Sequence, residues 1–402
     1  MSRPRLDDEE RRRRLARHGL GPAHRVGTVE EAVRAVVCLH ATEAPTVSLS
    51  VHARVDGLGR DDVEEAETVE RSVVRQLAMR RTMFVLPRDL LGATWGSAAA
   101  RTAAAERAKL VKDVVRAGIA ADGEAWMTRA EDAVLAALAA APEGLTTVQL
   151  RAAAPEIDVR AELPSSQVQP GRVLTVLGAQ ARIVRGANTQ HWRQYRPRWH
   201  RMEDWLGAEW LTGPGAHLAP ADGYVELVRC WLSRFGPGTE NDLVWWLGST
   251  KGAVRAALVA VGAVEVDLEG GATGYVLPGD EPVTGAREPW AALLPVLDPT
   301  TMGWKDRAWY LGPHEPVLFD RNGNGGTTAW WDGRVVGCWV QDPDGDVEVR
   351  LLEDVGALGR AALAVEARRL TTWLAGERVS PIYRAPAMTM ATADLPYPPV
   401  RA

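Results

Sequence analysis

Three side chains within four residues can do acid–base chemistry. His40, Thr42 and Glu43 supply an imidazole, a hydroxyl and a carboxylate. A histidine can orient a water molecule or take its proton, a hydroxyl can hold the water, and a carboxylate can act as a base or stabilise a cation. In an extended segment His40 and Thr42 would share a face, whereas a helical turn would separate them; if they share a face, these side chains could together position water. The alternative is structural, with His40 hydrogen-bonded at the end of an element and Thr42, Glu43 and Pro45 capping the next helix.

Arginines form the second set of candidate functional residues. Only four of the 47 basic residues are lysines, so 43 are arginines, and arginine binds phosphate in a bidentate way that lysine does not match. A GC-rich genome accounts for such a bias, but the positions of the arginines along the chain carry more information. Residues 163–202 hold seven arginines and no acid, so ion pairs within that block are impossible. We predict contacts to nucleic acid by Arg54, Arg80, Arg81, Arg182, Arg185, Arg193, Arg196 and Arg198.

Length, charge and composition exclude several classes of protein. The 402 residues suggest two to four domains, and the net charge of −5 excludes a polycationic protein of histone type. No stretch of 18 apolar residues is present and the N-terminus is charged throughout, so we expect neither a membrane span nor a secretory signal. Cys38, Cys230 and Cys338 are scattered, which is typical of buried thiols in a reducing cytoplasm. The eight histidines do not cluster as zinc ligands do, so we expect no metal and no cofactor.

The elements that must position these residues recur three times along the chain. Capping boxes begin at Thr28, Thr146 and Thr239, and apolar residues at helical spacing surround each of them. Hairpins are predicted after the second and third sets of helices, and the first copy, near residues 24–88, is inferred by analogy. The hairpin of the second copy is expected over residues 182–186 and 192–196, with arginines projecting from it. Three helices followed by a two-stranded wing is the winged-helix arrangement.

The two ends of the chain have a different pattern. Acids at positions 7–10 precede arginines at positions 11–14 by four residues, which favours a solvated helix over the alternative of a phosphate-contacting arm. After residue 285 we expect short strands, hairpin turns at Asp332-Gly333 and Asp344-Gly345, a helix over residues 355–374, and tryptophan pairs that belong mainly to the core. The predicted fold is α+β, with three tandem winged helices and a C-terminal β-rich domain. Its parts are an N-terminal helical arm (1–22), a first winged-helix region with the His40 segment (23–125), a second winged helix with an arginine-rich wing (126–215), a third winged helix (216–284) and the β-rich domain (285–402).

Short motifs along the chain occur in an order that is more specific than any one of them. They are Arg11–Leu15 with Leu20, Leu39–Pro45 running into Ala53-Arg54, Arg80–Pro87, Phe235–Pro237 with Asp242-Leu243 and Trp246, Leu293–Asp298 with Gly303 and Arg307, and Asp332–Trp339. In this order the chain resembles the winged-helix DNA-binding-domain family that contains the AlkZ-like and YcaQ-like bacterial DNA glycosylases.

The resemblance implies both a partner and a reaction. It implies winged helices and a β-rich domain around a concavity that binds double-stranded DNA, and hydrolysis of the N-glycosidic bond of bulky alkylated purines, interstrand crosslinks included, by a monomer. The family's catalytic signature is Gln-x-Gln or Gln-x-Asp, and the matching positions here hold His40 and Thr42, followed by Glu43. An alkylated purine is cationic and leaves as a neutral base, so the site needs chiefly a positioned water molecule and stabilisation of an oxocarbenium-like sugar. The variant residues are competent for both tasks.

Three hypotheses remain at this point. The first is a DNA glycosylase for bulky alkylpurines, serving repair or self-resistance against a DNA-damaging antibiotic. The second is a DNA-binding protein of the same fold that has lost catalysis. The third is a protein-interaction scaffold, because winged helices also serve that role.

Overall fold

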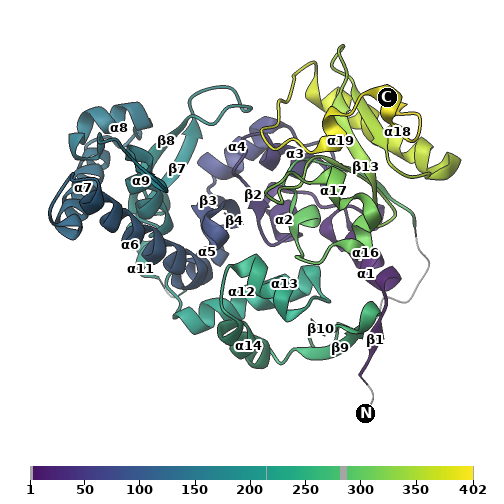
Figure 1. The fold of residues 1–402 in the computed structure, drawn as a ribbon, viewed down its shortest axis with the longest axis horizontal. Helices are drawn as coiled ribbons and strands as arrows, with labels where there is room; N and C mark the ends of the chain where they lie inside the picture. The colour runs from purple at the N-terminus through teal and green to yellow at the C-terminus, as the bar shows by residue number, and fades with distance from the viewer. Residues whose placement is uncertain (1–2, 214, 281–287, 402) are drawn as a thin grey trace. The chain divides into compact units, whose positions relative to one another are not determined.

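The computed structural model describes residues 3–213, 215–280 and 288–401. Contacts group the chain into two compact units, which we call the first unit (residues 1–63 and 228–402) and the second unit (residues 64–227). Two helices, α4 (Arg60–Thr68) and α12 (Pro220–Phe235), run across the boundaries. Helices and strands are interspersed in both units (Figure 1), which confirms the α+β class.

The three predicted capping boxes are all present. The hydroxyls of Thr28, Thr146 and Thr239 each accept a hydrogen bond from the third residue of the helix, whose own side chain reaches back to the capping residue. Each set of helices is followed by a hairpin, in the order that a winged helix requires. The winged-helix assignment and the five-part division stay predictions, and the predicted boundary between residues 284 and 285 lies outside the described residues.

Helices α6, α7 and α9 enclose the core of the second unit. Leu110, Met127, Val134 and Leu177 are buried there at 0% exposure. A small hairpin that the sequence did not predict, β5 with β6, precedes α9. The helices of this unit are α5 (Leu91–Thr94), α6 (Ala100–Arg116), α7 (Gly123–Ala139), α8 (Thr147–Ala153), α9 (Pro170–Ala179), α10 (Met202–Leu206) and α11 (Ala208–Thr212), and its strands are β3 (Val73–Leu77), β4 (Met83–Pro87), β5 (Ala161–Leu163), β6 (Ser166–Val168), β7 (Ile183–Asn188) and β8 (Pro197–Arg201).

The second strand of the arginine-rich wing begins later than predicted. We expected it over residues 192–196, but it is β8, which pairs antiparallel with β7. The loop between them is closed by side chains: Asn188 Oδ1 accepts from the Arg196 amide at 2.6 Å and the Thr189 hydroxyl donates to the Arg196 carbonyl at 2.8 Å. These bonds replace ladder pairing before residue 197, which the alternation of large side chains alone could not reveal.

A five-stranded antiparallel sheet dominates the C-terminal half of the first unit. Its order is β11 (Ala291–Leu294), β12 (Thr328–Trp331), β13 (Arg334–Gln341), β14 (Val347–Leu351) and β15 (Val400–Arg401). Helix α18 (Gly356–Leu374) packs against this sheet and nearly coincides with the helix predicted over residues 355–374. Positive φ angles at Asp332 (52°) and Gly333 (82°) make the tight turn between β12 and β13, as predicted. Trp330, at 0% exposure, confirms the expectation that this tryptophan belongs to the core.

The N-terminal arm packs within the first unit. Strand β1 pairs in parallel with β9, and Arg14 in α1, which is 2% exposed, lies 3.0 Å from Glu10 and 2.6 Å from Asp280. The predicted pairing of residues four apart is therefore present, and burial removes Arg14 from contact with phosphate. The helices of this unit are α1 (Asp8–Arg14), α2 (Val29–Arg34), α3 (Thr46–His52), α13 (Glu240–Leu247), α14 (Lys251–Ala260), α15 (Pro299–Met302), α16 (Ala308–Leu311), α17 (Glu315–Leu318), α18 (Gly356–Leu374) and α19 (Pro386–Thr389), and its strands are β1 (Arg5–Leu6), β2 (Leu39–His40), β9 (Val264–Leu268), β10 (Thr273–Val276), β11 (Ala291–Leu294), β12 (Thr328–Trp331), β13 (Arg334–Gln341), β14 (Val347–Leu351) and β15 (Val400–Arg401).

Among the described residues, no helix is long and apolar enough to cross a membrane.

Candidate active site and DNA-contact residues

Glu43 has the most unusual environment of the three residues predicted to position water. The residue is 3% exposed, and its Oε1 accepts a hydrogen bond from the backbone N–H of Ile382 at 2.6 Å. Its Oε2 is also buried, and none of the described residues donates a hydrogen bond to it. Burial raises the pKa of Glu43 to about 7, although the Ile382 N–H and the charge of Arg384 both act to lower it. A carboxyl group of this kind exchanges protons near neutral pH, and its Oε2 lacks a hydrogen-bond partner among the described residues.

His40 and Thr42 do not share one exposed face. His40 ends the short strand β2 and is 5% exposed, whereas Thr42 is exposed. Helix α3 begins after Pro45 with no side-chain capping hydrogen bond, so neither Thr42 nor Glu43 caps it. The capping role that was the structural alternative for Thr42 and Glu43 is therefore absent. Of His40 and Thr42, the two side chains predicted to hold a water molecule, Thr42 is the more accessible to solvent.

Arg54 is not a DNA-contact residue in this structure, contrary to prediction. Its side chain and that of Asp298 are both 0% exposed, and two guanidinium nitrogens lie 2.8 Å from the two carboxylate oxygens. Arg54 also donates to the Thr300 hydroxyl at 2.9 Å, and Asp298 accepts from the Ser50 hydroxyl at 2.8 Å. A guanidinium that is closed off from solvent and paired with an internal carboxylate cannot reach phosphate, so its role is to join the segment after α3 to the start of α15.

Aromatic rings organise the arginines of the wing. The guanidinium of Arg185 lies 5.2 Å from the ring centre of Tyr195 and 4.9 Å from that of Trp199. Tyr195 also accepts a hydrogen bond from Arg75 at 2.8 Å. Sequence reasoning missed Arg75 and Tyr195, because Arg75 comes from β3, 120 residues earlier.

The other arginines of the basic block differ in how strongly they are held. Arg182 lies 3.6 Å from Glu131, an acid outside the block, and Arg198 donates to the Gly144 carbonyl at 2.9 Å. Arg196 is exposed, and its side chain donates to the carbonyl of its neighbour, Tyr195. Arg193, half-buried, donates to His191 at 3.1 Å. Arg193 and Arg196 therefore remain the block's best candidates for phosphate contact.

Arg80 and Arg81 lie in the loop between β3 and β4. Both have positive φ angles, 53° and 59°, which places them in a tight turn. Arg81 is 54% exposed and lies 3.0 Å from Glu106. A surface ion pair of this kind is worth little, so phosphate can compete for Arg81.

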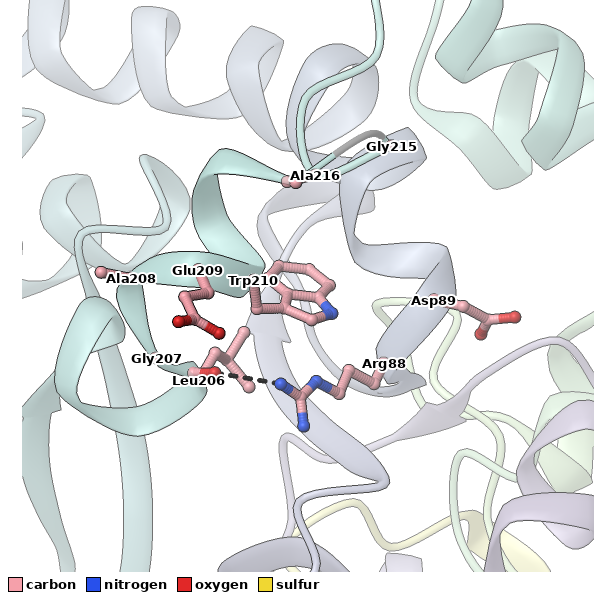
Figure 2. A pocket seen from close by; sticks show the side chains of 10 residues that line it. Arg88, Asp89, Leu206, Gly207, Ala208, Glu209, Trp210, Gly215 and Ala216 are labelled. Atoms are coloured by element: carbon pink, nitrogen blue, oxygen red, sulfur yellow. Dashed lines mark hydrogen bonds between the residues drawn. The ribbon is translucent and has the colours of Figure 1, made fainter.

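A cavity of about 690 Å³ lies elsewhere in the second unit, lined by residues of β4's end and of α10 and α11. Arg88 donates to the Leu206 carbonyl at 3.0 Å, and its guanidinium lies 5.4 Å from the ring centre of Trp210 (Figure 2). Asp89 points away from Trp210 (Figure 2). The sequence did not indicate this cavity, because Arg88 and Trp210 lie far apart along the chain and belong to no common motif.

Fold and site together define an α+β protein with repeated helix–hairpin segments, an arginine-bearing hairpin and a buried carboxyl group whose pKa burial raises to about 7. A model of the family described as AlkZ-like DNA glycosylase matches residues 33–373. The chain therefore belongs to the AlkZ-like DNA glycosylase family and is a DNA glycosylase, which confirms the resemblance and favours an enzyme over the two non-catalytic hypotheses.

Structural comparison agrees with this assignment at the level of the fold. The solved structure of Streptomyces sahachiroi DNA glycosylase AlkZ is similar, with a TM-score of 0.70 and 20% sequence identity over 95% of this chain and 99% of that chain. A comparison with curated proteins found no match.

Proposed function

We propose that this glycosylase hydrolyses the N-glycosidic bond of bulky alkylated purines in double-stranded DNA, for repair or self-resistance to a genotoxin. Glu43 handles the proton of the attacking water, and Thr42 holds that water. The observation that carries the proposal is the buried Oε2 of Glu43, to which no described residue donates a hydrogen bond. Glu43 follows the two positions, His40 and Thr42, that the resemblance aligns with the family's signature.

The chemistry requires little beyond these groups. The bond between the sugar C1′ and the purine nitrogen breaks, and its electron pair neutralises the cationic base, so no strong acid is needed. Water forms a new bond to C1′ and gives its proton to the Glu43 carboxylate, which later releases it to solvent. Before that step, the negative charge favours the oxocarbenium-like sugar. The products are the free alkylpurine and an abasic site.

Burial of Glu43 matches its pKa to this task. A base works best when its pKa lies near the operating pH, and burial raises that of Glu43 to about 7. We expect kcat/KM to rise with pH through about 7 and then to level off, because only the carboxylate form accepts the proton.

DNA contacts are assigned to the exposed or half-buried arginines. We propose that Arg80, Arg81, Arg193 and Arg196 contact phosphates, that Arg182 and Arg198 add to the positive potential, and that Arg185 acts by shaping the wing through Tyr195. Guanidinium groups suit this task because they bind phosphate oxygens in pairs.

The deciding experiment measures release of free base from duplex DNA that carries an N7-alkylguanine adduct. Glu43→Gln should lower kcat by about 10²–10⁴-fold, as expected for loss of a general base, while DNA binding is retained. Glu143→Gln, at an exposed position of the second unit, is the matched control and should leave the rate unchanged. Wild-type protein that binds duplex DNA but releases no base from any of several alkyl adducts would refute the substrate class.

His40 and Thr42 are tested separately. Thr42→Ala should lower kcat/KM without changing the midpoint of its pH profile, because the hydroxyl positions the water and does not titrate in this range. His40→Ala tests whether the imidazole takes part at all, and an unchanged rate would remove His40 from the mechanism.

A further inference from the structure

We propose that residues 380–384, which we call the strap, are a working part of the active site that positions the Glu43 carboxylate for reaction. This inference rests on the proposed role of Glu43. The strap lies outside the range matched by the family model, residues 33–373, so family membership assigns it no role. Its contact with Glu43 spans 339 positions of sequence.

The strap meets Glu43 through its backbone. The N–H of Ile382 donates to Oε1 at 2.6 Å, while the Ile382 side chain is 78% exposed. The residue is therefore held at this place by its backbone contact rather than by burial of its side chain. With Oε1 engaged, the carboxyl group has one fixed orientation, and Oε2 is the oxygen left for water.

Neighbouring contacts hold the strap at both ends. Just before it, the Val379 N–H donates to the Gln341 side chain in β13 at 2.8 Å. Just after it, Ala385 is buried at 1% exposure and leads into α19. The strap is thus supported by the sheet of the first unit, and this support fixes the position of the Ile382 N–H.

The electrostatics of the strap favour the ionised form of Glu43. Two residues of the strap, Tyr383 and Arg384, interact electrostatically with Glu43. The charge of Arg384 and the Ile382 N–H lower the pKa of Glu43, which burial alone would raise further. Tyr383 is neutral near pH 7, because burial and the nearby charges of Glu43 and Asp320 raise its pKa. Without the strap, less of Glu43 would be in the form that accepts a proton.

The test follows the titration of Glu43 directly. In protein labelled with ¹³C at the glutamate carboxyl carbon, the Glu43 resonance is assigned from the spectrum of Glu43→Gln and then titrated. Arg384→Gln should move the midpoint to higher pH, and Arg384→Lys should restore it. A tenfold weaker acid would hold about fivefold less carboxylate at pH 7, so kcat/KM should fall about fivefold there and recover at higher pH.

Two further variants separate positioning from general loosening. Ile382→Pro removes the N–H donor, although the ring also restricts the backbone, and should move the titration in the same direction. Arg378→Gln is the matched control, because Arg378 lies just before the strap and donates to the Asp342 carbonyl at 2.8 Å; it should leave the titration unchanged. A titration unaltered in both Arg384→Gln and Ile382→Pro, or shifted equally in Arg378→Gln, would overturn the proposal. The NMR readout needs no turnover, so failure of base release would count against the proposed function and not against the strap.

Discussion

Removing one member of the buried Arg54–Asp298 ion pair should destabilise the protein far more than removing both. Arg54→Met leaves the Asp298 carboxylate in the interior, where it still accepts hydrogen bonds from Ser50 and from the Thr300 N–H but has lost the guanidinium that lies 2.8 Å away. Loss of one partner of a buried pair costs about 3–5 kcal/mol, because the remaining charge stays desolvated. Asp298→Leu should cost a similar amount, since it leaves Arg54 without its carboxylate.

The double variant Arg54→Met/Asp298→Leu should be much closer to wild type. It buries no charge, and replacement of a buried pair by apolar residues is often neutral or stabilising. Urea unfolding of the four proteins, followed by circular dichroism, should give a coupling free energy well above about 3 kcal/mol, because two single losses of about 3–5 kcal/mol each largely disappear in the double variant. If each single variant loses less than about 1 kcal/mol and the losses add in the double variant, the reasoning from burial is wrong.

The same variants separate folding from DNA contact. Each phosphate contact contributes about 0.9 to the slope of log affinity against log salt concentration. Arg54→Met, studied where it remains folded, should keep the wild-type slope because its guanidinium is closed off from solvent. A slope reduced by about 0.9 would restore Arg54 as a phosphate contact and refute its assignment to the core.

Three further predictions concern the wing, the sheet and acid stability. Arg193→Ala/Arg196→Ala should reduce the salt slope of DNA affinity by about 1–2, and an unaltered slope would exclude both residues from phosphate contact. Gly337→Ala should lower the free energy of unfolding by about 1–3 kcal/mol, because its Cβ would lie 2.0 Å from the Arg350 carbonyl oxygen in β14; Gly252→Ala, which meets nothing within 4 Å, is the control and should not destabilise. Burial lowers the pKa of His52 from 6.5 to about 2. The contribution of the neutral imidazole to the free energy of unfolding is therefore complete above pH 6.5 and is lost as the pH falls below that value. Lowering the pH from 7 to 5 should therefore reduce the free energy of unfolding by about 2 kcal/mol. His52→Phe should remove that part of the pH dependence of unfolding measured in urea. An unchanged pH dependence would show that His52 is not buried in its neutral form.

Features that depend on neighbours in sequence were predictable. The capping boxes at Thr28, Thr146 and Thr239 join groups three residues apart, so the pattern itself contains both partners. The turn at Asp332 and Gly333 follows from the residue types that tolerate positive φ. Family membership was also predictable, because motifs in a fixed order survive where no one of them is specific.

Tertiary structure alone determined the environment of the functional residues. Arg54 is an arginine in a resemblance motif, and nothing local distinguishes a phosphate contact from a partner of Asp298, 244 positions away. Likewise, the His40–Glu43 segment identified a carboxyl group by type, but its pKa near 7 and its contact with Ile382 arise from burial by distant parts of the chain. Desolvation and long-range hydrogen bonding leave no periodicity in the sequence. The residue types and local elements could therefore be predicted from the sequence, whereas packing determined which arginines face solvent and which carboxyl group has a raised pKa.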